Sequence, residues 1–532
     1  MADYVVVGGG VAGCVIATRL SEDPDVRVLL IEAGPTDRNP YIHMPVGFAR
    51  MTGGPLTWKL KTAPQEHAMG REIPYAQGRV LGGGGSINAQ VFTRGRPADY
   101  DAWATECGCP GWGFEEVRRY FVRSEDNDTL AGAWHGNDGP LGVTTPCPQP
   151  ATRAFVRACQ QYGMPLNPDF NGPVQAGTGP YQITTRDGRR CATARGYLRP
   201  AMGRANLEVR TGVRVSRILI EKGRATGVAI EGSDGAEVLR AGREVIVTAG
   251  AIGSPKLMML SGLGPADHLR AHGIEVVADL AGVGADLQDH YGIDIVYETS
   301  GPLSLDKYNR WWWAASAGLE YALWRRGPVT SNIVEGGAFW FADAAAADDP
   351  AALPDLQFHF LVGAGVEAGV PAVPSGSGLT LNSYTLQPRA RGSVRLRSAR
   401  AEDAPVVDPN FLGAPEDLGT SIRGLEISRE IMAQPALARF VKTEHFPSAR
   451  VKGRSALEDY ARRYGRTSYH PVGTCRMGGD EGAVVDPELR VRGIEGLRVC
   501  DSSVMPRLVS SNTNAPTVMI AEKASDLIRG RQ

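Results

Sequence analysis

The sequence predicts an α/β protein (α+β overall) that combines a doubly wound parallel sheet with a second domain built on an antiparallel sheet and helices. A glycine-rich turn follows the first apolar run, and residues 244–250 form another apolar run that ends in small residues. Alternating runs follow at residues 355–362, 379–386 and 392–396, as is typical of antiparallel strands. At 532 residues the chain is longer than a single hydrophobic core usually becomes, so we expect two domains.

The chain begins with a dinucleotide-binding pattern of the Rossmann-like type. Residues 5–7 are three valines that predict a buried parallel strand, and Gly8 and Gly10 let the turn approach a pyrophosphate. Gly13 lets the following helix pack against the strand, with its positive N-terminus directed at the phosphates. Glu32 ends the next apolar run about 20 residues later, where an acid accepts hydrogen bonds from ribose hydroxyls. An acid at this position fits a ribose with a free 2′-OH, which disfavours NADP because its 2′-OH carries a phosphate. The pattern fits NAD and FAD equally.

The remaining segments predict that the chain leaves the first domain, builds the second and returns. Residues 207–220 and 225–230 alternate like strands, and residues 254–261 follow the buried run as a helix. Further helices are expected at residues 309–325, 415–433 and 517–528, and a short strand at 496–501. We expect the first domain to comprise residues 1–155, 196–298 and 461–532, and the second to comprise residues 156–195 and 299–460.

Composition narrows the class of protein. The formal net charge of −1 gives no electrostatic reason to expect nucleic acid or an acidic membrane surface as a partner. Met1 runs directly into the first strand and no apolar run reaches 18 residues, so a cytoplasmic location is expected, with peripheral membrane association left open. The eight cysteines form no CxxC pairs and the histidines form no cluster at metal spacing, which favours thiols over disulfides and predicts no metal.

Three ordered motifs then carry a resemblance that covers the whole chain. They are the glycine-rich residues 78–88, the segment 250–264 and the segment 468–478. With the N-terminal pattern, they make the chain resemble the glucose-methanol-choline (GMC) flavoprotein oxidoreductases. Within that family, the segments that most resemble bacterial FAD-dependent L-sorbose dehydrogenases are residues 189–191, 196–200, 334–340 and 357–360.

The resemblance implies FAD as the cofactor, bound in an extended form across the doubly wound domain, with its isoalloxazine ring reaching the interface with the second domain. Carried over to this sequence, the cofactor residues are Gly8, Gly10, Ala12 and Gly13 at the pyrophosphate, Glu32 with Ala33 at the ribose, Val215 at the adenine, Asp501 at the pyrophosphate or ribityl region, Gly83, Asn88 and Ala89 against the flavin, and Asn514 and Ala515 at its pyrimidine end. Relatives that attach the flavin covalently have a histidine where this chain has Ile87. Isoleucine has no nucleophilic atom, so the resemblance implies noncovalent FAD.

The resemblance also implies His470 and Asn512 as the catalytic pair. A flavin accepts only the hydride of an alcohol, at its N5 atom, so the protein must accept the hydroxyl proton. Histidine is the side chain best suited to that task near neutral pH, and a neutral amide can stabilise alkoxide character. Asn514 is the alternative to Asn512 in the same segment.

Two side chains of the second domain, Glu335 and His359, are candidates for substrate contact, with hydrogen bonding inside a sheet as the equal alternative. The three tryptophans at 311–313 either line an entrance or, as the preferred interpretation, anchor a helix to the core.

We therefore expect oxidation of a primary alcohol of a sugar or polyol such as L-sorbose, with an electron acceptor that the sequence does not identify. A choline, glycol or aryl-alcohol dehydrogenase or oxidase is the alternative within the family, and Glu335 with Trp340 keeps choline open. Two other classes also stay open, namely a nicotinamide-dependent dehydrogenase and a non-redox flavin-bearing lyase.

Overall fold

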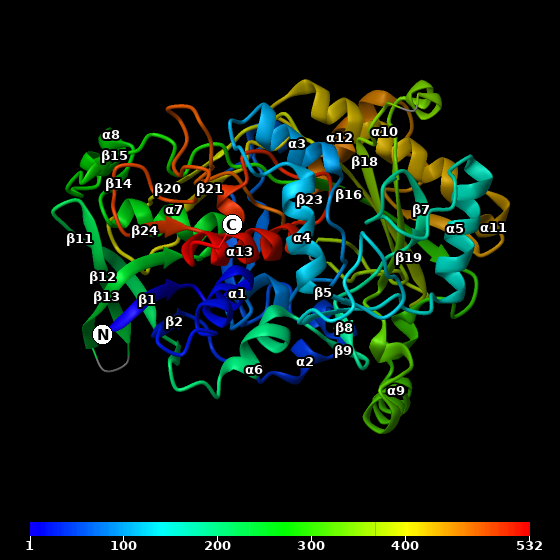
Figure 1. Ribbon diagram of the computed structural model, residues 1–532. Helices are drawn as coiled ribbons and strands as arrows, with labels where there is room; N and C mark the ends of the chain where they lie inside the picture. The colour runs from blue at the N-terminus through cyan, green and yellow to red at the C-terminus, as the bar shows by residue number, and fades with distance from the viewer. Residues whose placement is uncertain (233–234, 350, 368, 532) are drawn as a thin grey trace.

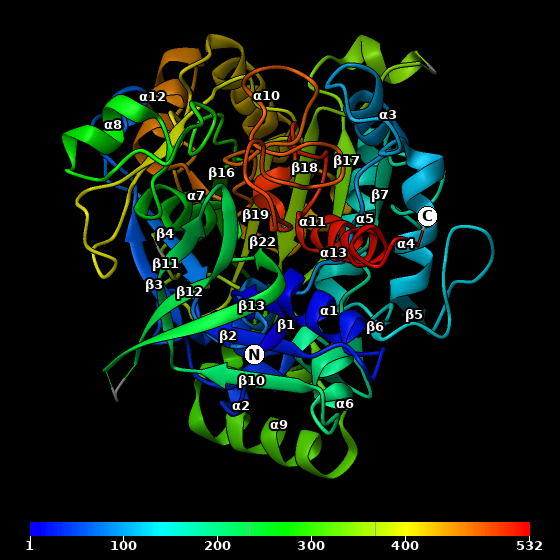
Figure 2. The same ribbon diagram turned by 60° about the vertical axis from the view of Figure 1, so that its left-hand side comes forward.

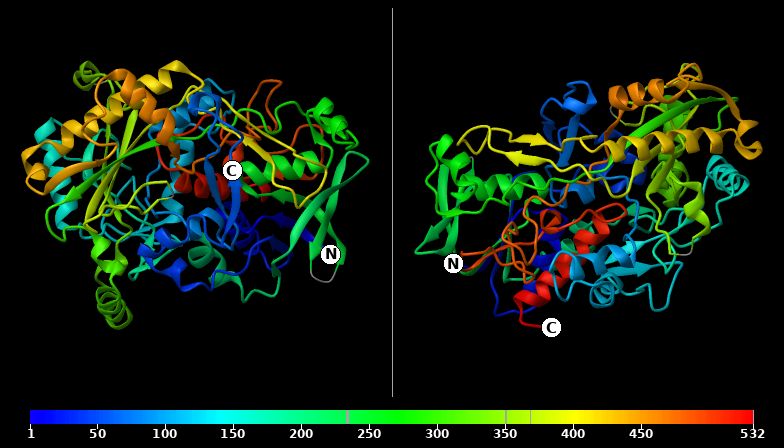
Figure 3. Two further views of the ribbon diagram at one scale, coloured as in Figure 1. Left: turned by 180° about the vertical axis from the view of Figure 1, so that it is seen from behind. Right: turned by 90° about the horizontal axis from the view of Figure 1, so that it is seen from above.

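The computed structural model describes residues 1–232, 235–349, 351–367 and 369–531. Two seven-stranded sheets organise it, one in each half of the molecule (Figure 1). Segments from the beginning and the end of the chain lie together around the first sheet, whereas the middle of the chain builds the second (Figure 3). The predicted combination of a doubly wound sheet with an antiparallel second sheet is confirmed.

The first sheet has a parallel core that is extended by an antiparallel meander. The parallel strands are, in spatial order, β10 (Leu207–Thr211), β2 (Val28–Glu32), β1 (Ala2–Val7), β13 (Gly235–Val247) and β24 (Leu497–Val499). The meander consists of β11 (Arg214–Glu221), β12 (Arg224–Gly232) and the first part of β13. Strand β13 therefore belongs to both parts, because its end pairs with β1 and its start pairs with β12.

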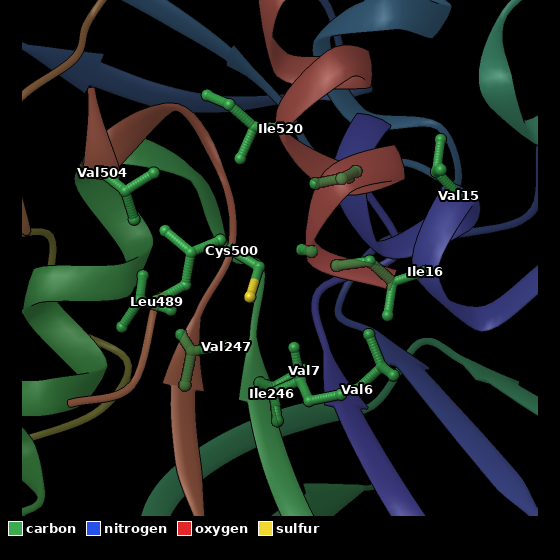
Figure 4. Close-up of a cluster of buried hydrophobic side chains, with 14 of the residues drawn as sticks. Val6, Val7, Val15, Ile16, Ile246, Val247, Leu489, Cys500, Val504 and Ile520 are labelled. Atoms are coloured by element: carbon green, nitrogen blue, oxygen red, sulfur yellow. The ribbon is translucent and has the colours of Figure 1, made fainter. Parts of the chain in front are cut away.

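Apolar side chains on both faces of this parallel core explain why its strands are continuous hydrophobic runs. Val6 and Val7 of β1 lie beside Ile246 and Val247 of β13, and all four are buried (Figure 4). Helix α1 (Val11–Leu20) packs on the sheet, and α13 (Asn514–Ile528), from the far end of the sequence, packs against α1. The two ends of the chain are thus packed into one hydrophobic core.

The second sheet is antiparallel throughout. Its order is β22 (Val441–Phe446), β16 (Tyr291–Thr299), β19 (Gly378–Thr385), β18 (Leu356–Leu361), β17 (Val334–Trp340) and β7 (Gly177–Pro180), and β23 (Arg466–Thr467) also pairs with β16. The helices α10 (Pro415–Met432) and α5 (Pro150–Tyr162) pack on it (Figure 1). Since β16 lies in this sheet, the expected domain boundary at residue 298 is too late, and the rest of the division stays a prediction.

Shorter elements fill the space around the two sheets. The helices are α2 (Pro40–His43), α3 (Pro97–Thr105), α4 (Phe114–Ser124), α6 (Arg199–Ala201), α8 (Ala266–Ala271), α11 (Pro435–Ala438) and α12 (Arg454–Tyr464). The paired short strands are β3 (Thr57–Lys61) with β4 (Pro74–Gly78), β5 (Glu125–Asn127) with β6 (Leu141–Val143), β8 (Thr185–Arg186) with β9 (Arg189–Arg190), β14 (Leu263–Gly264) with β15 (Ala278–Asp279), and β20 (Ser393–Arg395) with β21 (Val406–Asp408). The run at 392–396, expected in the antiparallel sheet, therefore belongs to a separate ribbon.

Helix α7 (Gly250–Leu260) begins four residues earlier than the sequence indicates. The Gly250 N–H donates to Asp501 Oδ2 at 2.8 Å, so the cap comes from a residue that is distant in sequence. Pro255 cannot donate within the helix, and the carbonyl of Ala251 accepts instead from Thr474 Oγ at 2.6 Å. Tertiary hydrogen bonds thus set the start of this helix.

Helix α9 (Trp311–Trp324) projects from the body of the protein (Figures 1 and 2). Trp311, Trp312 and Trp313 are 76%, 50% and 43% exposed, so the interpretation of these tryptophans as a core anchor is wrong. Among the described residues, no helix has both the length and the apolar content that crossing a membrane requires.

Candidate active site

One cavity of about 470 Å³ joins the glycine turn after β1 to the second sheet. Most residues assigned from the sequence line it, namely Gly8, Gly10, Ala12, Glu32, Ala33, Gly83, Asn88, Ala89, Val215, His359, His470, Asp501, Asn512 and Asn514. Gly13 and Ala515 instead pack within helices α1 and α13. The cofactor residues and the catalytic pair therefore face one continuous space.

Backbone geometry shapes the nucleotide end of this cavity. Gly8 has a φ of +110°, which side-chain-bearing residues rarely adopt. A Cβ atom on Gly13 would lie 1.9 Å from the Gly8 carbonyl oxygen, so only glycine lets α1 approach the turn. A Cβ atom on Gly10 would meet no protein atom closer than 3.8 Å and would point into the cavity. The turn therefore fits a flat pyrophosphate held against main-chain N–H groups.

The second glycine run, residues 82–85, packs directly on this turn. The Gly82 N–H donates to the Gly9 carbonyl at 2.7 Å. A Cβ atom on Gly83 would lie 2.9 Å from Gly10 Cα. Ile87 follows in the cavity wall and is buried. Two glycine motifs far apart in the sequence therefore form one wall.

Two acids reinforce the nucleotide end. Glu32 accepts from the N–H groups of Gly9 at 2.8 Å and Gly34 at 2.7 Å, and burial raises its pKa to about 7. Asp501 accepts from Gly250, Ser254 and Ser503, so its carboxylate already caps α7. Glu32 thus fits a ribose contact, whereas Asp501 shapes the wall through the elements that it caps.

The reacting end brings together side chains from three distant segments. Asn512 Nδ2 lies 3.2 Å from His470 Nε2. Asn514, the alternative for the same role, begins α13 and lines the cavity beside Gly85. His359 of β18 also lines this end. Residues that are distant in sequence, His359, His470 and Asn512, therefore meet at this end only in the folded protein.

A relay of hydrogen bonds fixes the tautomer of His470. His290 Nε2 lies 2.8 Å from the Leu386 carbonyl, which can only accept, so this nitrogen carries the proton. Burial lowers the pKa of His290 to about 4, so the ring is neutral and its Nδ1 accepts. His470 Nδ1, at 2.9 Å, must therefore donate to it. Consequently the bare nitrogen of a neutral His470 is Nε2, which faces Asn512.

The Asn512 amide is oriented just as firmly. Its Oδ1 accepts from Thr93 Oγ at 2.9 Å and from Gln357 Nε2 at 3.2 Å. Gln357 is itself held by Tyr384, whose hydroxyl donates to Oε1 at 2.7 Å. The Asn512 NH₂ group must therefore point towards His470, and its second N–H is left for a substrate oxygen.

Burial also keeps this end of the cavity free of positive charge on its histidines. It lowers the pKa of His359 to about 3 and that of His470 well below the ordinary value, and the neighbouring histidines add to the effect on His470. A neutral imidazole can accept a proton, whereas an imidazolium cannot. His470 is thus in the state that a general base requires.

The backbone around His470 is held in an unusual conformation. Tyr469 has a φ of +64°, a left-handed value that is costly for a bulky residue. Asp289 compensates, because its Oδ1 accepts the His470 N–H at 2.8 Å and its Oδ2 accepts from Tyr75 at 2.6 Å and from Thr467. Asp289 and His290 could not be predicted, since no local motif marks them, whereas Gln357 lies in the segment 357–360 but had no role assigned.

The structure corrects one expectation about substrate contact. Glu335 does not line the cavity; its carboxylate accepts from Ser331 Oγ at 2.6 Å, Thr152 Oγ at 2.9 Å and the Gln149 N–H at 2.7 Å. These bonds make Glu335 an internal structural group.

All eight cysteines are free thiols, and in the described part of the chain no three His, Cys, Asp or Glu side chains gather as a metal site would require.

The fold and the cavity define a two-domain oxidoreductase that binds a dinucleotide. Residues 2–292 match the N-terminal part, and residues 388–521 the C-terminal part, of the GMC oxidoreductases. The chain belongs to this family. FAD is therefore its cofactor, and it acts on the CH–OH group of alcohols.

Three similar proteins illustrate the range of the family. An alcohol dehydrogenase [acceptor] of Pseudomonas putida is 40% identical over 99% of this chain and 96% of its own length. An oxygen-dependent choline dehydrogenase of Sinorhizobium medicae is 40% identical over 100% of this chain and 96% of its own length. The structure of pyridoxine 4-oxidase from Mesorbium loti aligns with a TM-score of 0.91 at 32% identity and covers both chains completely. The finer likeness to L-sorbose dehydrogenases stays a proposal.

Proposed function

We propose that this chain oxidises a neutral primary alcohol to the aldehyde, with His470 as proton acceptor. The observation that carries the proposal is the bare His470 Nε2 beside the fixed Asn512 NH₂ group. The alcohol hydroxyl would replace the Asn512 N–H at Nε2 and donate to that nitrogen, while its oxygen accepts an N–H of Asn512, which stabilises developing negative charge. When bound, FAD supplies the acceptor for the carbon-bound hydride.

The charges near the reacting end favour a neutral substrate over choline. Arg466 lines the cavity and lies 2.8 Å from Asp294 and 3.9 Å from Glu367, so these charges largely compensate one another. Glu367 also lines the cavity, but burial raises its pKa and Arg466 lies beside it, so no uncompensated carboxylate faces a quaternary ammonium there. Glu335 and Trp340, which would have formed a cation site, do not line the cavity.

A hydroxylated substrate such as L-sorbose is a second candidate within this class. Ser468 Oγ is buried and has no hydrogen-bond partner among the described residues, and Asn382 and Tyr469 lie in the same wall. These groups could pair with additional hydroxyls. Phe48 and Leu361 supply apolar surface in the same cavity, which favours a simple alkyl or aryl alcohol.

Anaerobic mixing of the flavin-loaded protein with single alcohols tests these proposals. The measurement is the loss of flavin absorbance with a 1-alkanol, an aryl alcohol, L-sorbose and choline. We expect at least one neutral alcohol to exceed choline by about tenfold or more in the second-order rate. L-sorbose above the other neutral alcohols selects the polyol candidate. Choline as the fastest substrate overturns the neutral class, and no bleaching with any alcohol overturns the redox proposal.

We further propose that the FAD is noncovalent, because Ile87 stands in the wall where attachment would need a nucleophile. Acid precipitation should therefore release the yellow colour into the supernatant. Colour that remains in the washed pellet would contradict this proposal.

A further inference from the structure

Helix α9 has almost no protein around it. Of its 14 residues only Ala317 and Tyr321 are buried, and Tyr321 reaches the His43 carbonyl at 3.4 Å. The helix otherwise contacts the short turns at its two ends, residues 305–309 and 328–330. Figure 2 shows it separated from the sheets, below the body of the protein. Almost its entire circumference is therefore open to whatever surrounds the protein.

The open surface of α9 is strongly apolar. Besides the three tryptophans at its start, Leu319, Leu323 and Trp324 are each about 60% exposed, at 60%, 59% and 59%. Monomeric soluble proteins rarely expose apolar side chains in such a continuous group, and such groups usually mark an interaction site. Other exposed apolar side chains, such as Leu166 and Met202, are scattered over the surface.

Positive charge flanks this apolar surface at both ends. Lys307 and Arg310 precede the helix, and Arg325 and Arg326 follow it. Residues 306–326 contain four cations against two acids, Asp306 and Glu320, a local excess of two positive charges in a chain of net charge −1. Arg310 lies 5.9 Å from the Trp312 ring and Arg326 lies 5.3 Å from the Trp324 ring.

We propose that α9 docks this protein onto the surface of an anionic phospholipid bilayer. Tryptophans at both ends of a helix with adjacent arginines match the chemistry of the headgroup region, where aromatic rings and cationic side chains are both favourable. At 1.5 Å per residue the helix is about 21 Å long, too short to span the hydrocarbon core, so it lies along the surface.

The arrangement of the tryptophans favours a bilayer over a protein partner. Consecutive helical residues point about 100° apart, so Trp311, Trp312 and Trp313 cover most of the circumference. A protein surface would bury one face of the helix and leave the others exposed. A helix that lies along a bilayer sinks about 5–10 Å into the headgroup region, so the bilayer contacts side chains on more than one of its faces. The proposal is independent of the substrate and of the catalytic residues.

Flotation of the complete FAD-loaded protein with lipid vesicles tests the proposal. We expect binding to vesicles of phosphatidylcholine mixed with phosphatidylserine, weakened by high salt, and much less binding to phosphatidylcholine alone. Replacing Trp311, Trp312 and Trp324 together by serine should lower the bound fraction at least about tenfold. The charge reversals Arg310→Glu and Arg325→Glu should remove the preference for anionic vesicles.

Matched controls separate docking from misfolding. Leu166→Ser with Met202→Ser removes exposed apolar side chains elsewhere and should leave vesicle binding unchanged. Every variant should keep its flavin content and its activity towards a water-soluble alcohol. Absence of wild-type binding to anionic vesicles would overturn the proposal. A second outcome would also overturn it. If the wild-type protein is a dimer, and the tryptophan substitutions make it a monomer without changing vesicle binding, then α9 contacts a second copy of the chain.

Discussion

The two ends of the cavity are built from different parts of the polypeptide. The nucleotide end is shaped mainly by the main chain, where Gly8, Gly10 and Gly83 leave room for a ligand. The reacting end consists of side chains, where His470 and Asn512 are each fixed by further side chains behind them. The nucleotide end therefore depends on the absence of Cβ atoms, whereas the reacting end depends on side-chain atoms in defined positions.

This difference predicts opposite sensitivities to substitution. Adding an atom damages the nucleotide end, because the added Cβ collides with backbone that cannot move away. Removing an atom damages the reacting end, because a buried donor or acceptor then loses its partner. Substitutions at the nucleotide end should therefore lower the FAD content. Substitutions at the reacting end should lower kcat while the FAD content stays full.

The largest effect is expected from Gly13→Val. The side chain would begin 1.9 Å from the Gly8 carbonyl oxygen, so α1 must move away from the turn. We expect purified protein with almost no bound FAD and no measurable turnover, read from the ratio of flavin to protein absorbance. Gly203→Ala is the matched control, since nothing lies within 4 Å of the added atom. Full flavin content in Gly13→Val would contradict the proposed difference in sensitivity between the nucleotide end and the reacting end.

The next effect is that of His470→Ala, which removes the proton acceptor. We expect kcat to fall by roughly 10²-fold or more while FAD stays bound. His67→Ala, a change at a partly exposed histidine that does not line the cavity, should leave kcat unchanged. A decrease of less than about threefold would mean that another group accepts the proton.

Asn512→Ala should reduce kcat less than the histidine change, by roughly tenfold to 10²-fold, because it removes one donor to the substrate oxygen. Asn514→Ala is the informative comparison, since this side chain lines the same cavity from the start of α13. Loss of turnover in Asn514→Ala with flavin retained, and little change in Asn512→Ala, would reverse the assignment.

His290→Leu tests the relay that fixes the His470 tautomer. His470 Nδ1–H would lose its acceptor, and we expect kcat/KM to fall about tenfold, with partial recovery in His290→Gln, whose amide can both accept and donate. Because burial lowers the pKa of His470, the wild-type acid limb of kcat/KM should lie below pH 6.5, since protonation of the base begins only there. An acid limb above pH 7 would contradict a buried neutral base.

The strand, turn and helix at the nucleotide end could be predicted from the sequence, because their physical requirements are local. A strand, a turn without Cβ atoms and a helix follow one another within residues 2–20, so the pattern is contiguous. The start of α7 was misplaced because its cap, Asp501, comes from the other end of the chain. For the reacting end, family resemblance pointed to His470 and Asn512. His290 has no local signature, and Gln357 lies in a family-like segment whose pattern does not show that it contacts Asn512.

The tryptophans of α9 show a different limit. An apolar helical segment has the same sequence pattern whether it packs in a core or stands alone, and only the tertiary structure decides which occurs. The net charge misleads in the same way, because a total of −1 conceals a local cationic excess.

The relay behind His470 ends on the carbonyl oxygen of Leu386, and no side-chain replacement can delete a main-chain carbonyl. Val334 and Leu361 line the cavity but take no side-chain part in that relay. A mutant library that varies these two positions would therefore change the shape offered to the alcohol while the proton acceptor keeps its orientation. For laboratory evolution, this scaffold separates the choice of substrate from the chemistry performed on it.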